Sequence, residues 1–362
     1  MNKIKHTLIL MATVFSVVLF CTACGGGRLR HRAELGDTIK LSYARLLTMV
    51  RYEDYVHVVV KDPWHQGQIL QEYDVKKPFQ HLAVFSSPHT QLLLWLGAGK
   101  EIAGVCDLNY MVIPSVQKAV AARQMYDFGS SMSPDVESIV SAGCDAILLS
   151  PFENSGGFGK LEKIGVTLIQ AADYMEPTAL GRAEWMKLYG VLTGHEREAD
   201  SLFSVVEKNY KMLCSSASKL KRGRSILTER KTGATWYTPG GRSTIANILR
   251  DANAGYAFYQ DGHTGSLALS PEEVIDKAGN TDVWAFKVSG PTMMTRSDLL
   301  DEYHGYAVLK ALKTGEVYEC LSSRVPYFEE VAFRPDYLLR EYILLSHLGE
   351  YPGALRYFKK LQ

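Results

Sequence analysis

The stretch HEREADSLFSVVEKNYKMLCSSASKL, from His195 to Leu220, contains neither glycine nor proline. Its apolar residues recur every three or four positions, as on one face of a helix. They are Ala199, Leu202, Phe203, Val206, Tyr210, Leu213, Cys214, Ala217 and Leu220. The pattern predicts one helix of roughly 39 Å at 1.5 Å per residue. A helix this long either joins two lobes or forms the core of one domain, so the flanking sequence has to decide.

Residues that favour helix termini stand at both ends of this stretch. Thr193, followed three positions later by Glu196, has the pattern of a capping box. Lys219 and Lys221 suit the negative end of the helix dipole, and Gly223 follows them. We therefore expect a single helix that is bounded on both sides.

Short apolar strands alternate with polar turns and helices on both flanks. The predicted strands cover 81–85, 102–105, 125–128, 146–149 and 166–169 before the helix, and 225–228, 283–286 and 317–319 after it. Residues 236–243 are predicted to form a turn that opens a helix through Leu249, and 335–361 to form a helical tail. The alternation predicts parallel sheets with right-handed crossovers, in which ligands gather at the carboxyl ends of the strands. The predicted fold class is α/β, with two Rossmann-like lobes joined by one long helix.

Length and composition are those of an ordinary globular protein with room for two domains. The chain has 362 residues, of which 46% are hydrophobic and 22% charged. Lysine plus arginine number 40, and aspartate plus glutamate number 39. Without a basic excess, nucleic acid is not an expected partner.

The N-terminus has the pattern of an export signal. Lys3 and Lys5 precede an apolar run over 8–20, and the sequence CTACGGG follows. Small residues before Cys24 resemble a bacterial lipobox, in which that cysteine is acylated. The alternative is an uncleaved anchor, but the run is shorter than the roughly 20 residues of a spanning helix. We expect a periplasmic lipoprotein that is held at the membrane through Cys24.

These patterns divide the chain into consecutive segments. They are a lipoprotein signal peptide over 1–23, an N-terminal extension over 24–80, a first α/β lobe over 81–194, the interlobe helix over 195–222 and a second α/β lobe over 223–362. The extension should contain an antiparallel hairpin of 55–60 and 68–73, with Trp64 and His65 packed at its tip.

The remaining cysteines and the histidines do not have metal-site spacing. Cys106, Cys144, Cys214 and Cys320 form no C-x-x-C or Cys/His motif, so no zinc site is expected. Cys106 and Cys144 adjoin strand-like segments, where cysteine usually behaves as a small buried hydrophobe. An oxidising compartment would permit disulfides, and the sequence leaves their pairing open.

Several motifs occur in the order of one known family. They are FSSPHTQLLLWLGAG over 85–99, DFGS over 127–130, DVESI over 135–139, GCDAILL over 143–149, GRAEW over 181–185, LSPEEV over 269–274, DVW over 282–284 and RPDYLL over 334–339. From about Leu82 to the C-terminus, the chain resembles the substrate-binding proteins of ABC importers for iron-siderophores, haem and vitamin B12. It departs from the family at 347–349, where His-Leu-Gly replaces a frequent His-Pro-Glu.

The resemblance implies the class of these binding proteins that has a helical backbone. Two lobes would clasp the ligand and close only slightly, because one continuous helix resists bending. It implies a monomeric binding protein without a cofactor, not an enzyme, that delivers an iron chelate, haem or a corrinoid to an ABC importer permease. Glu137 and Glu272 match the pair that docks onto permease arginines, with Glu273 as the fallback. Charges at helix starts also favour the dipole, which is the alternative explanation.

The family's ligand positions fall on the predicted polar turns. They are Ser87, His89, Tyr110, Phe128 and Phe152 in the first lobe, and Arg230, Trp236, Ser266, Lys287, Arg324 and Tyr327 in the second. Aromatic rings suit flat macrocycles or catechols, and basic groups suit carboxylates or an anionic ferric complex. Candidates for a haem axial ligand are His89, Tyr110, His263, His304 and Tyr327.

Two other functions stay open at this point. One is a periplasmic enzyme for metal chelates, such as a chelatase, that would use His89 and Glu153 across a cleft. The other is a scavenging or sensing lipoprotein that has the same fold but never docks on a permease.

Overall fold

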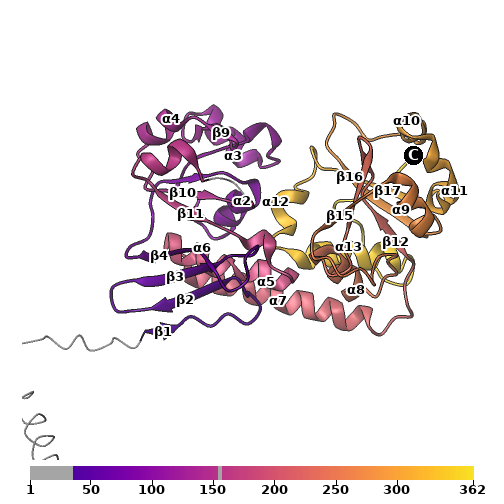
Figure 1. The fold of residues 1–362 in the computed structure, drawn as a ribbon, viewed down its shortest axis with the longest axis horizontal. Helices are drawn as coiled ribbons and strands as arrows, with labels where there is room; N and C mark the ends of the chain where they lie inside the picture. The colour runs from indigo at the N-terminus through magenta and orange to yellow at the C-terminus, as the bar shows by residue number, and fades with distance from the viewer. Residues whose placement is uncertain (1–35, 154–156) are drawn as a thin grey trace, which may run out of the picture. The chain divides into compact units, whose positions relative to one another are not determined.

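A computed structural model describes residues 36–153 and 157–362, and its longest helix is α7, Glu196–Ala217 (Figure 1). The prediction of one unbroken helix is confirmed, but the capping box is wrong. Thr193 is the last residue of helix α6, Met186–Thr193, and its hydroxyl donates to the Tyr189 carbonyl at 2.7 Å. Gly194, at φ 77°, ends α6, so α7 begins only after His195.

The carboxyl end of α7 is held by a side chain from the second lobe. Asn253 donates from Nδ2 to the carbonyls of Ala217 at 3.3 Å, Leu220 at 3.0 Å and Lys221 at 3.3 Å. Asn253 itself has φ 55°, a left-handed conformation that asparagine tolerates. It satisfies carbonyls that a helix end leaves free.

The first lobe contains the predicted parallel sheet, in the order β11-β10-β5-β6-β7. Its strands are β5 Leu82–Val84, β6 Ile102–Val105, β7 Tyr126–Asp127, β10 Ala146–Leu149 and β11 Thr167–Gln170, with a small hairpin of β8 Gly129–Ser130 and β9 Ser133–Pro134. Its helices are α2 Ser87–Trp95, η1 Leu108–Tyr110, α3 Pro114–Ala121, α4 Val136–Ser141, η2 Gly159–Lys163, η3 Asp173–Met175, α5 Ala179–Glu184 and α6. All five predicted strands of this lobe are confirmed within one or two residues.

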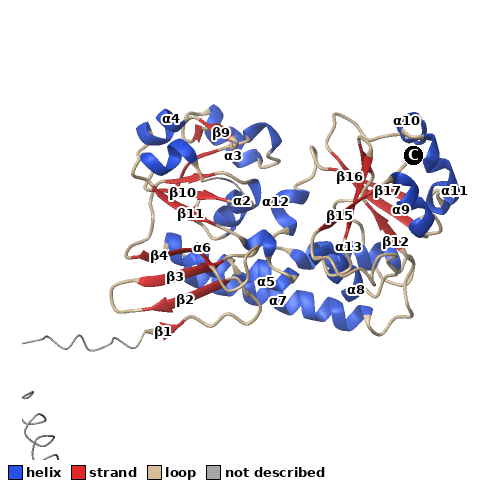
Figure 2. Cartoon of the chain, in the orientation of Figure 1, coloured by secondary structure: helices blue, strands red, loops and turns tan. Residues whose placement is uncertain are grey.

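The second lobe contains a sheet in the order β12-β16-β17-β18, parallel except for the pairing of β17 with β18. A separate antiparallel sheet has the order β13-β14-β15. Figure 2 shows β12, β15, β16 and β17 of this lobe as red strands. The strands are β12 Ile226–Thr228, β13 Lys231–Thr232, β14 Thr235–Pro239, β15 Ser266–Leu269, β16 Val283–Val288, β17 Val317–Leu321 and β18 Lys359–Lys360. The helices are α8 Thr244–Asp251, α9 Pro271–Ala278, α10 Arg296–Glu302, η4 His304–Val308, α11 Lys310–Thr314, α12 Tyr327–Val331 and α13 Pro335–Ser346.

Two sequence predictions for this lobe are wrong. Residues 236–239 belong to strand β14 rather than to a turn, because they pair with β15. The helical tail ends at Ser346, not at residue 361. Beyond it, the backbone N–H groups of Arg356, Tyr357 and Phe358 donate to the buried carboxylate of Glu341, which holds the tail as an extended segment.

The predicted hairpin of the N-terminal extension is part of a larger antiparallel sheet, in the order β1-β2-β3-β4. Its strands are β1 Asp37–Thr38, β2 Leu47–Arg51, β3 Val56–Lys61 and β4 Ile69–Val75. At the join with the first lobe, Gln71 of β4 donates to the Leu168 carbonyl and accepts from Gln170 N–H at 2.9 Å. The extension thereby covers the edge strand β11.

Two buried carboxylates fix the extension to the helices before α7. Glu184 accepts the N–H groups of residues 42, 43 and 44, and Glu176 accepts those of residues 45 and 46.

Trp64 is half-buried and His65 exposed. Cys106 and Cys144 are buried as predicted, and the four cysteines of the described ranges are free thiols. Within those ranges, no helix combines the length and the apolar character needed to cross a bilayer. Cys24 lies outside the described residues.

Candidate functional site

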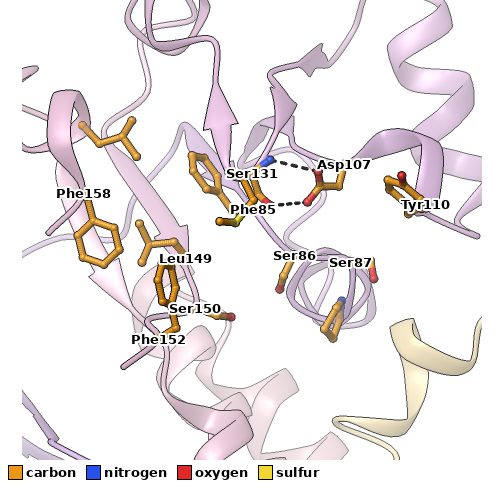
Figure 3. Close-up of a pocket in the computed structure, with 13 residues that line it drawn as sticks. Phe85, Ser86, Ser87, Asp107, Tyr110, Ser131, Leu149, Ser150, Phe152 and Phe158 are labelled. Atoms are coloured by element: carbon orange, nitrogen blue, oxygen red, sulfur yellow. Dashed lines mark hydrogen bonds between the residues drawn. The ribbon is translucent and has the colours of Figure 1, made fainter. Parts of the chain in front are cut away.

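A pocket of about 440 Å³ lies at the carboxyl ends of β5, β6 and β10 (Figure 3). It is lined by Phe85, Ser86, Ser87, Pro88, Asp107, Tyr110, Ser131, Met132, Leu149, Ser150, Phe152, Phe158 and Leu161. A pocket-lining aromatic or polar residue follows the end of each strand, namely Phe85 after β5, Asp107 after β6 and Ser150 after β10. The pocket therefore occupies the edge at which parallel sheets usually bind ligands.

Asp107 organises one wall of this first-lobe pocket. It adopts a left-handed conformation, with φ 56°, and its N–H donates to the Gly129 carbonyl at 2.7 Å. Its carboxylate accepts the N–H of Ser131 at 3.1 Å and also the Ser131 hydroxyl (Figure 3). These contacts hold the β8–β9 hairpin against the strand end, so that Met132 at the hairpin tip lines the pocket.

A second pocket, of about 510 Å³, is shared by the two lobes. Its first-lobe lining is Asn109, Tyr110, Met111, Val112, Ile113, Pro114 and Gln117, and its second-lobe lining is Ser289, Ser322, Ser323, Arg324 and Phe328. Tyr110 lines this interlobe pocket and the first-lobe pocket alike. The two cavities are therefore neighbours.

A third pocket, of about 380 Å³, lies mainly on the second lobe and includes Arg230, Ser266 and Lys287. The cationic groups of this second-lobe pocket are neutralised locally. Arg230 pairs with Glu302 at 2.6 Å, and Lys287 pairs with Glu229. Arg324 of the interlobe pocket differs from both, since it contacts the Pro291 carbonyl at 3.3 Å and has no carboxylate at ion-pair distance within the described ranges.

Large apolar side chains are exposed around these cavities. The exposed fraction is 78% for Tyr110, 79% for Met132, and 50% for both Phe152 and Phe328. A cluster of uncovered apolar surface in a concave region is typical of a binding site. The described residues contain no group of three His, Cys, Asp or Glu side chains arranged to hold a metal ion.

Residues 82–323 match the family model described as "Periplasmic binding protein". The chain belongs to the periplasmic binding protein family. The match covers the first lobe from β5 onward, α7 and the second lobe as far as Ser323, whereas the extension before residue 82 and residues 324–362 lie outside it. A binding protein agrees with cavities lined by exposed aromatic rings.

One curated relative of this periplasmic binding protein is an uncharacterized lipoprotein from Methanocaldococcus jannaschii. It is 26% identical over 247 residues, which are 67% of this chain and 58% of the relative. The matched part therefore spans a little over half of the relative's length.

Solved structures of low sequence identity share the fold. A "possible" iron-binding (periplasmic solute-binding) protein from Staphylococcus epidermidis is 21% identical, with a TM-score of 0.57 over 74% of this chain and 99% of that one. A periplasmic heme-binding protein from Pseudomonas aeruginosa is 14% identical, with a TM-score of 0.60 over 78% and 98% of the two chains. Both likenesses confirm the two-lobed α/β architecture predicted from the sequence.

Seven of the ligand positions predicted from the sequence line a pocket of this periplasmic binding protein. They are Ser87, Tyr110, Phe152, Arg230, Ser266, Lys287 and Arg324. The pockets bring Ser87, Tyr110 and Phe152 together in the first lobe. Their contact with a ligand stays a prediction.

The other four predicted positions, His89, Phe128, Trp236 and Tyr327, are core residues, and this corrects the expectation that they face the ligand. Phe128 packs over Gly104, and the Trp236 indole donates to the Thr228 carbonyl at 3.3 Å. Tyr327 packs edge-on against Phe328 and two rings of the C-terminal tail.

His89 is buried on the far side of α2, with Nε2 2.9 Å from Asp173. Burial opposes the charge of Asp173, but His89 and Arg182 hold the pKa of this carboxyl below its ordinary value. His89 therefore does not reach the cleft, as the chelate-enzyme hypothesis required. Of the five candidates for a haem axial ligand, Tyr110 is the one that lines a described pocket.

The two glutamates predicted to dock on a permease are exposed, each in the first turn of a helix. Glu137 lies in α4 and Glu272 in α9, where Glu273 instead completes a capping box with Ser270. Glu272 accepts a hydrogen bond from the Tyr303 hydroxyl at 2.7 Å, which lowers the pKa of this carboxyl. Permease docking stays a prediction for both.

Sequence reasoning missed several residues that line the pockets, among them Asp107, Met132, Phe158 and Phe328. Asp107 had a usable signal, because it is the second residue after strand β6 and belongs to a polar turn. Phe328 had none in the family motifs, and its neighbour Tyr327 was chosen instead. Both residues lie in the first turn of the short helix α12, where Tyr327 is buried and Phe328 is half exposed.

Proposed function

We propose that this protein is a lipid-anchored periplasmic binding protein that delivers an iron complex, either a ferric siderophore or haem, or a corrinoid to an ABC importer. Membership of the periplasmic binding protein family supports the transport role. The lipobox around Cys24 and the lipoprotein relative support the anchor.

The observation that carries the proposal is the set of uncovered rings near Arg324, which has no carboxylate partner among the described residues. Tyr110 and Phe328 present aromatic surface to the interlobe pocket that Arg324 lines, and Phe152 presents it to the neighbouring first-lobe pocket. Aromatic side chains stack on flat or conjugated ligands, and an arginine can bind a carboxylate through two parallel hydrogen bonds. A large organic chelate with an anionic group fits this arrangement better than a bare metal ion.

The similar solved structures and the aromatic lining of the pockets favour related ligands. The solved structures of similar fold include an iron-binding and a heme-binding protein, and the aromatic lining suits either ligand. Haem adds a requirement for an axial ligand, which Tyr110 would supply. A corrinoid would use the rings but has less need of Arg324.

Thermal unfolding with a panel of ligands tests the proposal. Haemin, ferric desferrioxamine B and cyanocobalamin are added in turn to the purified protein. The free ligand concentration is set to about a hundred times a Kd in the micromolar range. A ligand that binds only the folded state then stabilises it by about 2.7 kcal/mol. We expect at least one of the three to raise the melting temperature. No shift with any of them would contradict the proposed ligand class.

Charge reversal tests the delivery step separately from binding. We expect E137K and E272K together to abolish uptake in cells while the purified variant keeps its affinity for the ligand. E350K, which reverses an exposed glutamate near the C-terminus, is the matched control. Unchanged uptake in the double variant would favour a scavenging or sensing lipoprotein, which is the alternative function on this fold.

A further inference from the structure

A buried carboxylate of the second lobe contacts the first lobe next to the ligand cavities. Glu329 lies in helix α12, which packs against α2 of the first lobe. Its side chain is 1% exposed, and Oε1 accepts the backbone N–H of Val112 at 2.9 Å. The two residues are 217 positions apart in the chain, so this hydrogen bond directly links the lobes.

Val112 belongs to the loop between β6 and α3, which carries pocket-lining residues. Tyr110 of this loop lines the first-lobe pocket and the interlobe pocket. Met111 and Ile113 are buried and anchor the loop to the core of its own lobe. The Glu329 contact falls between these two anchors and fixes the backbone from the opposite lobe.

Among the residues that the structure describes, no cation pairs with the Glu329 carboxylate. Oε2 is buried and has no hydrogen-bond partner among the described residues. Burial raises the pKa of Glu329, since the charged form loses its hydration. Ser87, which lines the first-lobe pocket and begins α2, lowers the pKa of Glu329, and the charge of the neighbouring Glu330 raises it.

A buried, unpaired carboxylate usually destabilises a fold, and an apolar side chain at this position would have a lower free-energy cost of burial. Its hydrogen bond is with a pocket-lining loop of the other lobe, at Val112. From this contact we infer that Glu329 is a positioning residue for ligand binding: it holds the Tyr110 loop in its binding geometry from across the lobes. This inference rests on the proposed function for its effect on affinity, but not for the contact itself.

The test compares E329A, E329Q and E330A in the full-length protein. Glu330 is a matched control, because it is a buried carboxylate of the same helix whose partners, Arg356 and Tyr357, lie in the second lobe. Hydrogen exchange of the peptide that covers residues 108–113 is measured first, without ligand. Haemin affinity and the melting temperature are measured on the same samples.

We expect E329A to speed exchange of this peptide by about tenfold or more, since Val112 loses a hydrogen bond to a charged group. E329Q should exchange nearly as the wild type does, because its amide oxygen can still accept from Val112. Haemin affinity should follow the same order, with a loss of about tenfold in E329A and nearly wild-type affinity in E329Q. E330A should lower the stability of the protein without changing hydrogen exchange at residues 108–113.

Several outcomes would overturn the inference. Wild-type exchange in E329A would show that the contact does not hold the loop. Equal acceleration in E330A would show a general loosening of α12 instead of a specific contact. If the wild type fails to bind haemin, the haem form of the proposed function fails, while the exchange data still decide whether Glu329 positions the loop.

Discussion

Replacing Glu184 with glutamine tests how the N-terminal extension is attached to the family fold. The Glu184 carboxylate is fully buried and accepts three backbone N–H groups, from Ser42 at 2.8 Å, Tyr43 at 2.7 Å and Ala44 at 2.9 Å. Glutamine has nearly the same shape, so it leaves no cavity. It removes the charge and places an NH2 group against N–H donors.

The expected loss follows from the hydrogen bonds that change. A hydrogen bond to a charged group contributes about 1.5–3 kcal/mol, and a neutral one about 0.5–1.5 kcal/mol. The amide oxygen of glutamine can keep at most two of the three bonds, both in neutral form. An amide is also cheaper to bury than a carboxylate, which offsets part of the loss. We therefore expect E184Q to lower the free energy of unfolding by about 2–4 kcal/mol.

Urea unfolding of E184Q and of the control E72Q measures this difference. Glu72 is an exposed glutamate of the same extension, so its replacement should change stability by less than about 0.5 kcal/mol. Hydrogen exchange of residues 42–46 should also be faster in E184Q than in wild type. If E184Q matches E72Q in both measurements, the carboxylate does not hold the extension.

Three further predictions concern single contacts. N253G should keep the left-handed backbone but lose the side-chain bonds to the end of α7, and we expect urea unfolding to show a loss of about 1–2 kcal/mol. The contacts of Asp282 with Ser225 and Lys310 lower the pKa of this carboxyl to about 2, against the opposing effect of burial. Its stabilisation is thus present above pH ~4 and lost as the pH falls toward 2, so thermal melts should show D282N less stable at pH 7 and less sensitive to acid. Y303F should raise the pKa of the Glu272 carboxyl in an NMR titration, because the Tyr303 hydrogen bond holds it down.

The α/β fold could be predicted because its signals are local. The strands at 102–105 and 146–149 are short apolar runs flanked by turns, and the period of 195–220 specifies a helix without reference to other segments. The errors arose where a distant segment decides the local structure. Residues 236–239 form a strand because β15 pairs with them, and residues 356–358 are extended because Glu341 binds their backbone.

The location of the candidate site could be predicted, but its electrostatics could not. Strand ends indicate which edge of a parallel sheet binds ligand, and this rule correctly brought Ser87 and Phe152 to one pocket. It does not reveal that Glu302, 72 positions away, neutralises Arg230, whereas Arg324 keeps its charge available. Nor does it reveal on which side of a turn a side chain lies, which is why His89 was expected in the cleft.

The most direct test of a ligand held between the lobes is a calorimetric titration of one variant from each lobe. F152A changes the first-lobe pocket, and R324A changes the interlobe pocket. Phe152 is 50% exposed and Arg324 is also exposed, so neither substitution should unfold the protein. With whichever of haemin, ferric desferrioxamine B or cyanocobalamin binds the wild type, we expect each variant to lose about tenfold or more in affinity at an unchanged melting temperature. Wild-type affinity in either variant would contradict a ligand gripped by both lobes.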